Sequence, residues 1–184
     1  TSVRLAVLAA LAASALTAGA ATLKFDRHPG LIPGQELQGI GSDIYLKGYR
    51  LAYAAAPGEP YPVGFMAVGK SWRFNGRSVA VVANSCGATT TLTRDDNNPF
   101  SAESIDLAPL NGDEKIRVRF RGVTPEGQQV EHEISSEAAR WRAFALPPEF
   151  ESLNSLTWWQ GDCVANPPHM FDNIRVGTVR RRTH

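Results

Sequence analysis

The sequence has little cysteine, no excess of charge of one sign and, after its first 20 residues, no long apolar run. Only two of its 184 residues are cysteines, and neither Cys-x-x-Cys nor paired His spacing for a four-ligand zinc site is present. Nineteen Lys and Arg stand against 18 Asp and Glu, whereas a nucleic-acid-binding domain normally carries a clear basic face. We therefore expect neither a zinc domain nor a nucleic-acid partner.

Catalytic motifs are also missing. The chain contains no Gly-x-Ser-x-Gly, no His-Glu-x-x-His and no Gly-rich phosphate loop. In Glu131-His132-Glu133, a strand would point His132 away from both glutamates. The sequence is still compatible with a pair of carboxylates at the separation that a glycosidase needs, because a sandwich brings distant residues together. The sequence favours a protein that is not an enzyme. A hydrolase with an unrecognised site ranks third, after the two binding functions given at the end of this section.

The start of the chain has the three parts of an export signal. Arg4 precedes an apolar stretch over residues 5–16, and Ala18-Gly19-Ala20 is a small-x-small cleavage site. The stretch is short and Ala-rich for a spanning helix, which usually needs about 20 strongly apolar residues. A buried N-terminal helix is the alternative. We expect residues 1–20 to be a signal peptide, the mature chain to have no membrane anchor, and the location to be secreted or periplasmic.

Cys86 and Cys163 both belong to the mature chain. An even number of cysteines in an oxidising compartment favours a disulfide between them. No linker, repeat or low-complexity tract divides residues 21–179, a length that suits one domain. Residues 180–184 include three consecutive arginines and are expected to form a basic, disordered tail.

A period-two alternation of apolar and polar residues dominates the mature chain. Ile116, Val118 and Phe120 alternate with arginines, and residues 130–134 alternate again after the Thr124-Pro125-Glu126-Gly127 turn signal. This pattern predicts a hairpin in which glutamates of the second strand face arginines of the first.

Other segments with strand character are separated by Gly, Pro, Asn and Asp clusters. They are residues 22–26, 44–54, 71–74, 78–83, 89–94, 104–107, 141–146, 155–159 and 171–179. Only residues 135–140 have the character of a helical turn. Many short strands with turns between them predict an all-β antiparallel sandwich or barrel. Asp95-Asp96-Asn97-Asn98 lacks the ligand spacing of an EF-hand and is better explained as a turn that tolerates left-handed backbone.

Several stretches resemble a group of exported bacterial proteins, many of which carry a PEP-CTERM sorting tail. The stretches are Leu23-Lys24-Phe25-Asp26, Thr91-Leu92-Thr93-Arg94, Pro99-Phe100-Ser101, Ser104-Ile105-Asp106-Leu107, the hairpin over 116–134, Phe144-Ala145-Leu146-Pro147, residues 153–158 and Phe171-Asp172-Asn173-Ile174. The resemblance implies a jelly-roll-like two-sheet sandwich, similar in shape to carbohydrate-binding modules, with its first and last strands adjacent. The chain ends without a Pro-Glu-Pro motif or an apolar anchor, so we expect release in soluble form.

Carbohydrate-binding jelly rolls often hold a structural calcium near their terminal strands. Asp26, Asp172 and Asn173 are therefore candidate ligands for calcium, which takes six to eight oxygens. The alternative is that these side chains bond only to local backbone. No other cofactor is expected.

Aromatic residues supply the candidate ligand-binding surface. In a strand Trp158 and Trp159 face opposite sides, and we expect Trp158 in the core and Trp159 outward, where a sugar ring or a partner can stack. A covering loop, such as the one that holds Cys163, is the alternative. Tyr45, Tyr49 and Tyr53 lie four residues apart, which on a single strand places them on one face for cross-strand packing or for binding.

The leading hypothesis is a secreted, noncatalytic binding module whose expected ligand is a glycan. The alternative is an extracellular structural or adhesive protein that binds another protein or itself. The sequence leaves the oligomeric state, the ligand and the biological process open.

Overall fold

The computed structural model describes residues 19–59, 63–83, 85–111, 115–137, 140–160 and 168–179. Residues 1–18 and 180–184 lie outside this part of the chain, so the signal peptide and the basic tail stay predictions. Within the described residues, no helix has the length and apolar character of a membrane span.

The described residues form strands joined by turns, together with one short 3-10 helix. The strands are β1 (Ala21–Leu23), β2 (Leu37–Gly41), β3 (Asp43–Leu46), β4 (Tyr49–Ala54), β5 (Phe65–Val68), β6 (Ala80–Ala83), β7 (Thr89–Arg94), β8 (Phe100–Pro109), β9 (Ile116–Val123), β10 (Gln129–Ser136), β11 (Arg142–Ala145), β12 (Ser155–Gln160) and β13 (His169–Thr178), and the helix is η1 (Pro148–Phe150).

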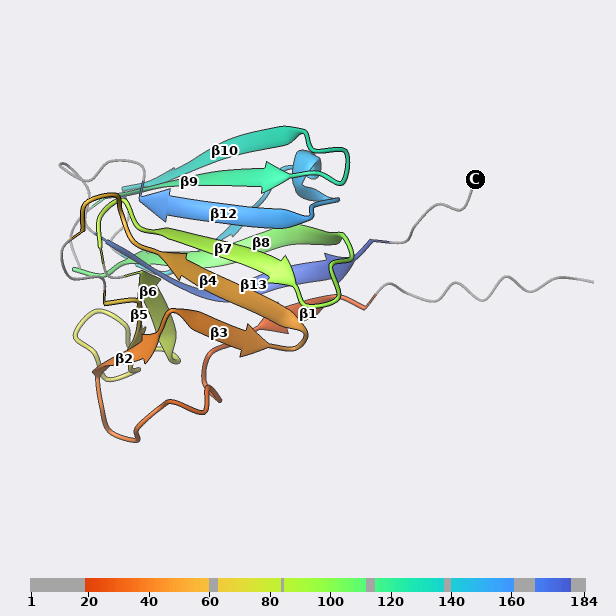
Figure 1. Ribbon diagram of the computed structural model, residues 1–184. Coiled ribbons are helices and arrows are strands. Elements are labelled where there is room, and N and C mark those ends of the chain that lie inside the picture. Colours follow the sequence, from red (N-terminus) through yellow and green to blue (C-terminus); the bar gives the residue numbers. More distant parts are fainter. Residues whose placement is uncertain are drawn as a thin grey trace, which may run out of the picture.

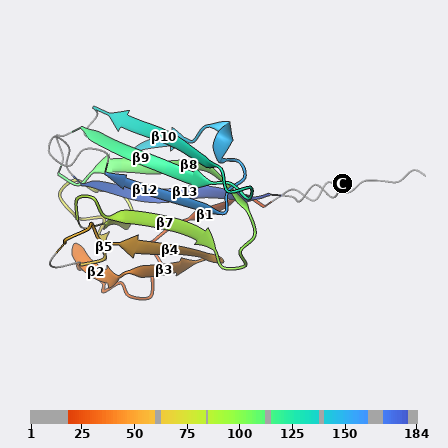
Figure 2. The same ribbon diagram turned by 45° about the horizontal axis from the view of Figure 1, so that its top comes forward.

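These strands build two antiparallel sheets that face each other (Figure 1). One has the order β11-β8-β13-β6-β5-β2, with β1 paired to β13 as a seventh strand. The other has the order β10-β9-β12-β7-β4-β3. The fold is therefore an all-β, jelly-roll-like sandwich, as the sequence predicts. Both sheets end at the same side of the molecule, where β2 and β3 follow each other in the chain (Figure 2).

The first and last strands are neighbours. Leu23 of β1 lies opposite Ile174 of β13, and both side chains are fully buried. The resemblance to jelly-roll proteins predicts this closure, and the structure confirms it. The strand is shorter than the predicted 22–26, but Phe25 just beyond it remains in the core, with its ring 5.6 Å from that of Phe171.

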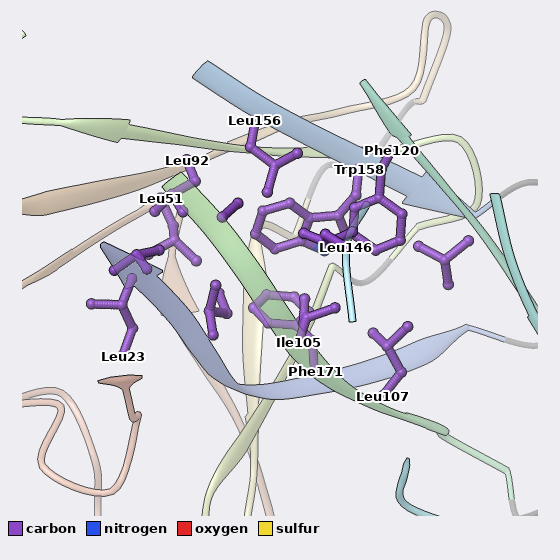
Figure 3. Packing of buried hydrophobic residues seen from close by; sticks show 14 of the residues in the cluster. Leu23, Leu51, Leu92, Ile105, Leu107, Phe120, Leu146, Leu156, Trp158 and Phe171 are labelled. Carbon is purple, nitrogen blue, oxygen red and sulfur yellow. The ribbon is translucent and has the colours of Figure 1, made fainter. Parts of the chain in front are cut away.

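The core lies between the two sheets and is filled by buried apolar side chains from both of them (Figure 3). Trp158 is at its centre, with ring centroids 5.1 Å from Phe171 and 6.3 Å from Phe120. Trp158 is only 1% exposed, so the prediction that it is the inward-facing tryptophan is confirmed. Apolar burial on this scale is the main source of the free energy that favours folding.

The predicted hairpin is present as β9 and β10. Arg119 lies opposite Glu133 and Arg121 opposite Glu131, and both pairs form ion pairs at 2.9 Å. Gly127 closes the turn with a φ of 81° and donates its N–H to the Thr124 carbonyl. The turn at residues 95–98 likewise contains a left-handed residue, Asn97, with a φ of 55°.

Residues 44–54 are a hairpin, and the prediction of one continuous strand there is wrong. Lys47 and Gly48 both have positive φ, 51° and 77°, and this two-residue turn reverses the chain between β3 and β4.

Residues 71–74 form a turn instead of the predicted strand. Asn75 ends this turn, is buried, and donates its side-chain amide to three carbonyls, those of Val68, Gly69 and Ser78. The Gly-rich strand β2 and the short strand β5 are absent from the prediction. Ser135 and Ser136 belong to β10, so the helical turn expected at 135–140 does not begin there; the 3-10 helix is η1.

Candidate functional site

Strand β12 presents Trp159 on the outer face of the six-stranded sheet. Leu156, Trp158 and Gln160 point inward and are buried, whereas Thr157 and Trp159 alternate with them and are half-buried. Trp159 lies opposite Arg119 on β9 and opposite Thr89 on β7. The prediction that Trp159 faces outward is confirmed. Residues 161–167, whose loop is the proposed alternative cover, lie outside the described residues.

An ion-pair ladder flanks this tryptophan on β9 and β10. Glu133 binds the Nε atoms of Arg117 and Arg119 at 3.3 and 2.9 Å, and Glu131 pairs with Arg121 at 2.9 Å. All five side chains are more than a third exposed, so solvent screens the pairs and each stabilises the fold only weakly. They place charged groups of both signs beside Trp159.

Two contacts restrain the surface around Trp159. The Arg121 guanidinium carbon lies 5.3 Å from the centre of the Trp159 ring, a cation–π distance. On the neighbouring row the hydroxyls of Thr91 and Thr157 are hydrogen-bonded at 2.9 Å. The face is therefore organised before any ligand arrives.

The side chains of Arg119, Glu131, Glu133 and Trp159 enclose an open hollow of about 390 Å³, which we call the Trp159 hollow. One wall is an aromatic ring, and the others offer guanidinium donors and carboxylate acceptors. An apolar surface combined with a few placed polar groups is the usual composition of a small-ligand site. Such a hollow has a stacking surface for one face of a sugar ring and hydrogen-bonding partners for its hydroxyls.

The three candidate tyrosines do not share one face. Tyr45 is 61% exposed on the outer face of β3, whereas Tyr49 is 5% exposed, with its ring 5.6 Å from that of Phe100. Tyr53 is half-buried and its hydroxyl is hydrogen-bonded to Ser85 Oγ at 2.8 Å. The prediction of a common face is wrong because the β3–β4 turn breaks the assumed strand, and burial accordingly raises the pKa of Tyr49.

Tyr45 is also far from Trp159 on the same outer face. Three strand spacings separate β12 from β3, and the register places the two residues four positions apart along the strands. These steps correspond to about 14 Å across and about 13 Å along the sheet, or about 20 Å in all. The two aromatic residues are therefore separate surface features.

The candidate calcium ligands form hydrogen bonds mostly with residues that are distant in the sequence. Asp172 is buried, and its carboxylate accepts hydrogen bonds from Ser78 Oγ at 2.6 Å and from the Asn173 N–H at 2.7 Å. Asp26 accepts the Val79 N–H at 3.0 Å, and Asn173 donates its amide to Asp106 at 2.9 Å. Burial, and secondarily the charge of Asp26, raise the pKa of Asp172.

Within the described residues no group of three or more His, Cys, Asp or Glu side chains is placed to hold a metal ion. Calcium binding at Asp26, Asp172 and Asn173 stays a prediction. So does the disulfide: Cys86 lies in the exposed turn between β6 and β7, and Cys163 lies outside the described residues.

His169 is a buried residue that precedes the strand predicted over residues 171–179. It begins β13, and its Nδ1 lies 3.0 Å from Gln160 Oε1 at one end of the core. Burial without a compensating charge lowers its pKa to about 4. In the sequence, only the apolar Met170-Phe171 that follows His169 indicates that this residue is buried.

We expect acid to destabilise the protein through His169. In the unfolded chain this histidine protonates near pH 6.5, but in the folded chain only near pH 4, so protons favour the unfolded state between these values. As pH falls from 6.5 to 4, the free energy of unfolding should decrease by about 3 kcal/mol from this group. Urea denaturation at several pH values, with His169→Gln beside the natural chain, measures the effect; identical pH dependence in both would contradict it.

No protein-family model and no curated protein matches the chain. Among solved structures, it is similar to a family 29 carbohydrate-binding module from Piromyces equi, at 12% identity over 92% of this chain and 96% of that chain, with a TM-score of 0.48. It is also similar to the C-terminal domain of a chitobiase from Bacteroides fragilis, at 11% identity over 75% of this chain and 99% of that chain, with a TM-score of 0.44.

A third similar structure is a family 32 carbohydrate-binding module from C. perfringens in complex with galactose. Its identity to this chain is 7%, over 73% of this chain and 98% of that chain, with a TM-score of 0.41. These are similarities of overall shape. The resemblance to exported proteins with PEP-CTERM tails stays a prediction.

Proposed function

We propose that this protein is a noncatalytic binding module that acts outside the cytoplasm and takes a glycan on the outer face of its six-stranded sheet. The observation that carries the proposal is the Trp159 hollow, in which an aromatic side chain on β12 lies beside the Arg–Glu ladder of β9 and β10. The site is open to solvent, which suits a ligand that is part of a longer polymer.

Each part of the hollow has a matching part in a sugar. The C–H face of a pyranose ring is apolar and packs on Trp159, whose ring is partly exposed. Hydroxyl groups accept hydrogen bonds from Arg119 and donate them to Glu131 and Glu133. The ion pairs partly restrict these three side chains, which reduces the rotamer entropy that is lost when the ligand binds.

The same carboxylates are poorly suited to hydrolysis. A glycosidase needs one carboxyl group held in the protonated form by an apolar environment. Glu131 and Glu133 are both exposed and both ion-paired with arginines, so neither has that environment. The arrangement therefore favours binding over acid catalysis.

Trp159→Ala should weaken glycan binding by about 30-fold. Truncating a central aromatic residue of a binding site typically costs 2 kcal/mol or more, and about 2 kcal/mol corresponds to this factor. A glycan array with the purified chain identifies a binding oligosaccharide, and titration calorimetry with that oligosaccharide gives the dissociation constants. Trp159→Phe should retain part of the affinity because it keeps an aromatic face.

Tyr45→Ala is the matched control, since it removes an exposed aromatic from the same outer face about 20 Å away. It should leave the affinity for a di- or trisaccharide unchanged. The proposal fails if no glycan on the array binds, or if Trp159→Ala binds as tightly as the natural chain.

A second candidate function, adhesion to another protein or to a second copy, is favoured by one observation. Ile32, Leu37, Tyr45 and Val63 are the large apolar side chains that the described residues expose. All four lie on β2 or β3 or in segments that lead into β2 or β5, near the edge where the two sheets end together (Figure 2). Leu37→Lys would abolish an interaction through this edge in a pull-down or a size-exclusion measurement, while glycan binding at Trp159 remains.

A further inference from the structure

A second hollow, of about 400 Å³, lies on the other sheet, away from Trp159. It is formed between the chain segment that precedes β2 and the strands β5 and β6. Leu31, Ile32 and Val79 contribute apolar surface, while Asp26 and Lys70 contribute opposite charges. We call it the Asp26–Lys70 hollow.

The walls of this hollow are tied together by hydrogen bonds. Gly69 donates its N–H to the Glu36 carbonyl at 2.7 Å, and a side chain at Gly69 would meet the Gln35 carbonyl oxygen at 2.8 Å. Gln38 accepts the Ile32 N–H at 2.8 Å and donates its amide to the Gly30 carbonyl. The segment that precedes β2 is therefore held in place by hydrogen bonds, and it packs so closely on the end of β5 that only glycine fits at position 69.

Two charges of opposite sign line the hollow without neutralising each other. Asp26 uses one carboxylate oxygen to accept the Val79 N–H, and its other oxygen has no hydrogen-bond donor among the described residues. Neither Asp26 nor Lys70 takes part in any ion pair of the described residues, although eight other pairs form there. Both side chains are exposed, so both are available to a ligand.

We propose that the Asp26–Lys70 hollow binds a zwitterion with an apolar body, such as a short peptide with apolar side chains and free ends. Its ammonium group pairs with the free oxygen of Asp26 and its carboxylate with Lys70. The apolar side chains cover Leu31, Ile32 and Val79; Ile32 is 54% exposed without a ligand. This site is independent of the glycan site at Trp159.

The dipeptide leucyl-leucine is the probe, and binding is measured by titration calorimetry in the presence of EDTA. The natural chain should bind it in a saturable manner. N-acetyl-leucyl-leucine, which lacks the ammonium group, and leucyl-leucinamide, which lacks the carboxylate, should each bind about two- to fivefold more weakly, as expected for a solvent-exposed ion pair.

Variants assign each end of the ligand. Asp26→Asn should weaken leucyl-leucine two- to fivefold but leave N-acetyl-leucyl-leucine unchanged, because that ligand has no ammonium group to lose. Lys70→Met should likewise weaken leucyl-leucine two- to fivefold. It should leave leucyl-leucinamide unchanged, because that ligand has no carboxylate to lose. Lys115→Met, which replaces an exposed lysine directly before β9, and Trp159→Ala should both bind leucyl-leucine as the natural chain does. Absence of saturable binding, or equal weakening of all three ligands by a variant, would overturn the proposal.

Discussion

A chain that lacks residues 170–184 is expected not to fold, whereas a chain that lacks only residues 180–184 should fold with unchanged stability. The longer deletion removes β13, which lies inside the seven-stranded sheet between β8 and β6 and also pairs with β1 (Figure 1). Phe171, Ile174 and Val176 on this strand are fully buried. Truncating one buried Phe or Ile costs about 2–5 kcal/mol, and a domain has only about 5–15 kcal/mol in all.

Far-UV circular dichroism and thermal denaturation of the two truncated chains measure this effect. The shorter deletion is the control, because it leaves β13 intact and removes only residues 180–184, three of which are arginines. A chain without residues 170–184 that still unfolds cooperatively at the natural melting temperature would show that β13 is dispensable. The closed sandwich would then be incorrect.

Phe171→Ala should lower the free energy of unfolding by about 3–5 kcal/mol, the usual cost of removing a buried aromatic side chain. The ring of Phe171 lies 5.1 Å from that of Trp158, 5.6 Å from Phe25 and 6.4 Å from Phe65, so it connects residues from both sheets and from the segment after β1. A close-packed core fills such a cavity only partially. Urea denaturation measures the change.

Phe74→Ala is the matched control for this substitution. Phe74 is half-buried in the turn after β5, where its ring lies 4.8 Å from the Arg73 guanidinium, and it is not one of the buried core residues. Its removal should cost about 1 kcal/mol or less. Equal effects of the two substitutions would contradict the central position of Phe171.

Local alternation was sufficient to predict several elements. The β9–β10 hairpin has strong alternation on both strands and a Pro/Gly turn, so both its existence and its cross-strand ion pairs follow from neighbouring residues. The inward position of Trp158 and the outward position of Trp159 follow from the same period of two. These features need no information about distant parts of the chain.

The predictions from the sequence were wrong where the local residue pattern does not determine the direction of the chain. Residues 44–54 are rich in residues typical of strands, but Lys47-Gly48 reverses the chain, and Tyr49 consequently enters the core while Tyr45 stays exposed. Residues 71–74 contain aromatic residues typical of strands, yet the hydrogen bonds of Asn75 hold them in a turn. A left-handed lysine and a buried amide are both decided by the surrounding structure, since intrinsic propensities are small beside tertiary contacts.

The sequence by itself determined the class of fold, the hairpin and the side of β12 on which Trp159 lies, because each depends on residues that are neighbours in the chain. Only the tertiary structure decided that β12 lies next to β9, which puts Arg119 and Glu133 beside Trp159 and creates the hollow. Likewise, only the fold of the segment before β2 brings Asp26 and Lys70 to one hollow. The physical reason is that non-local strand pairing is selected by burial of the whole core, and no single segment encodes it.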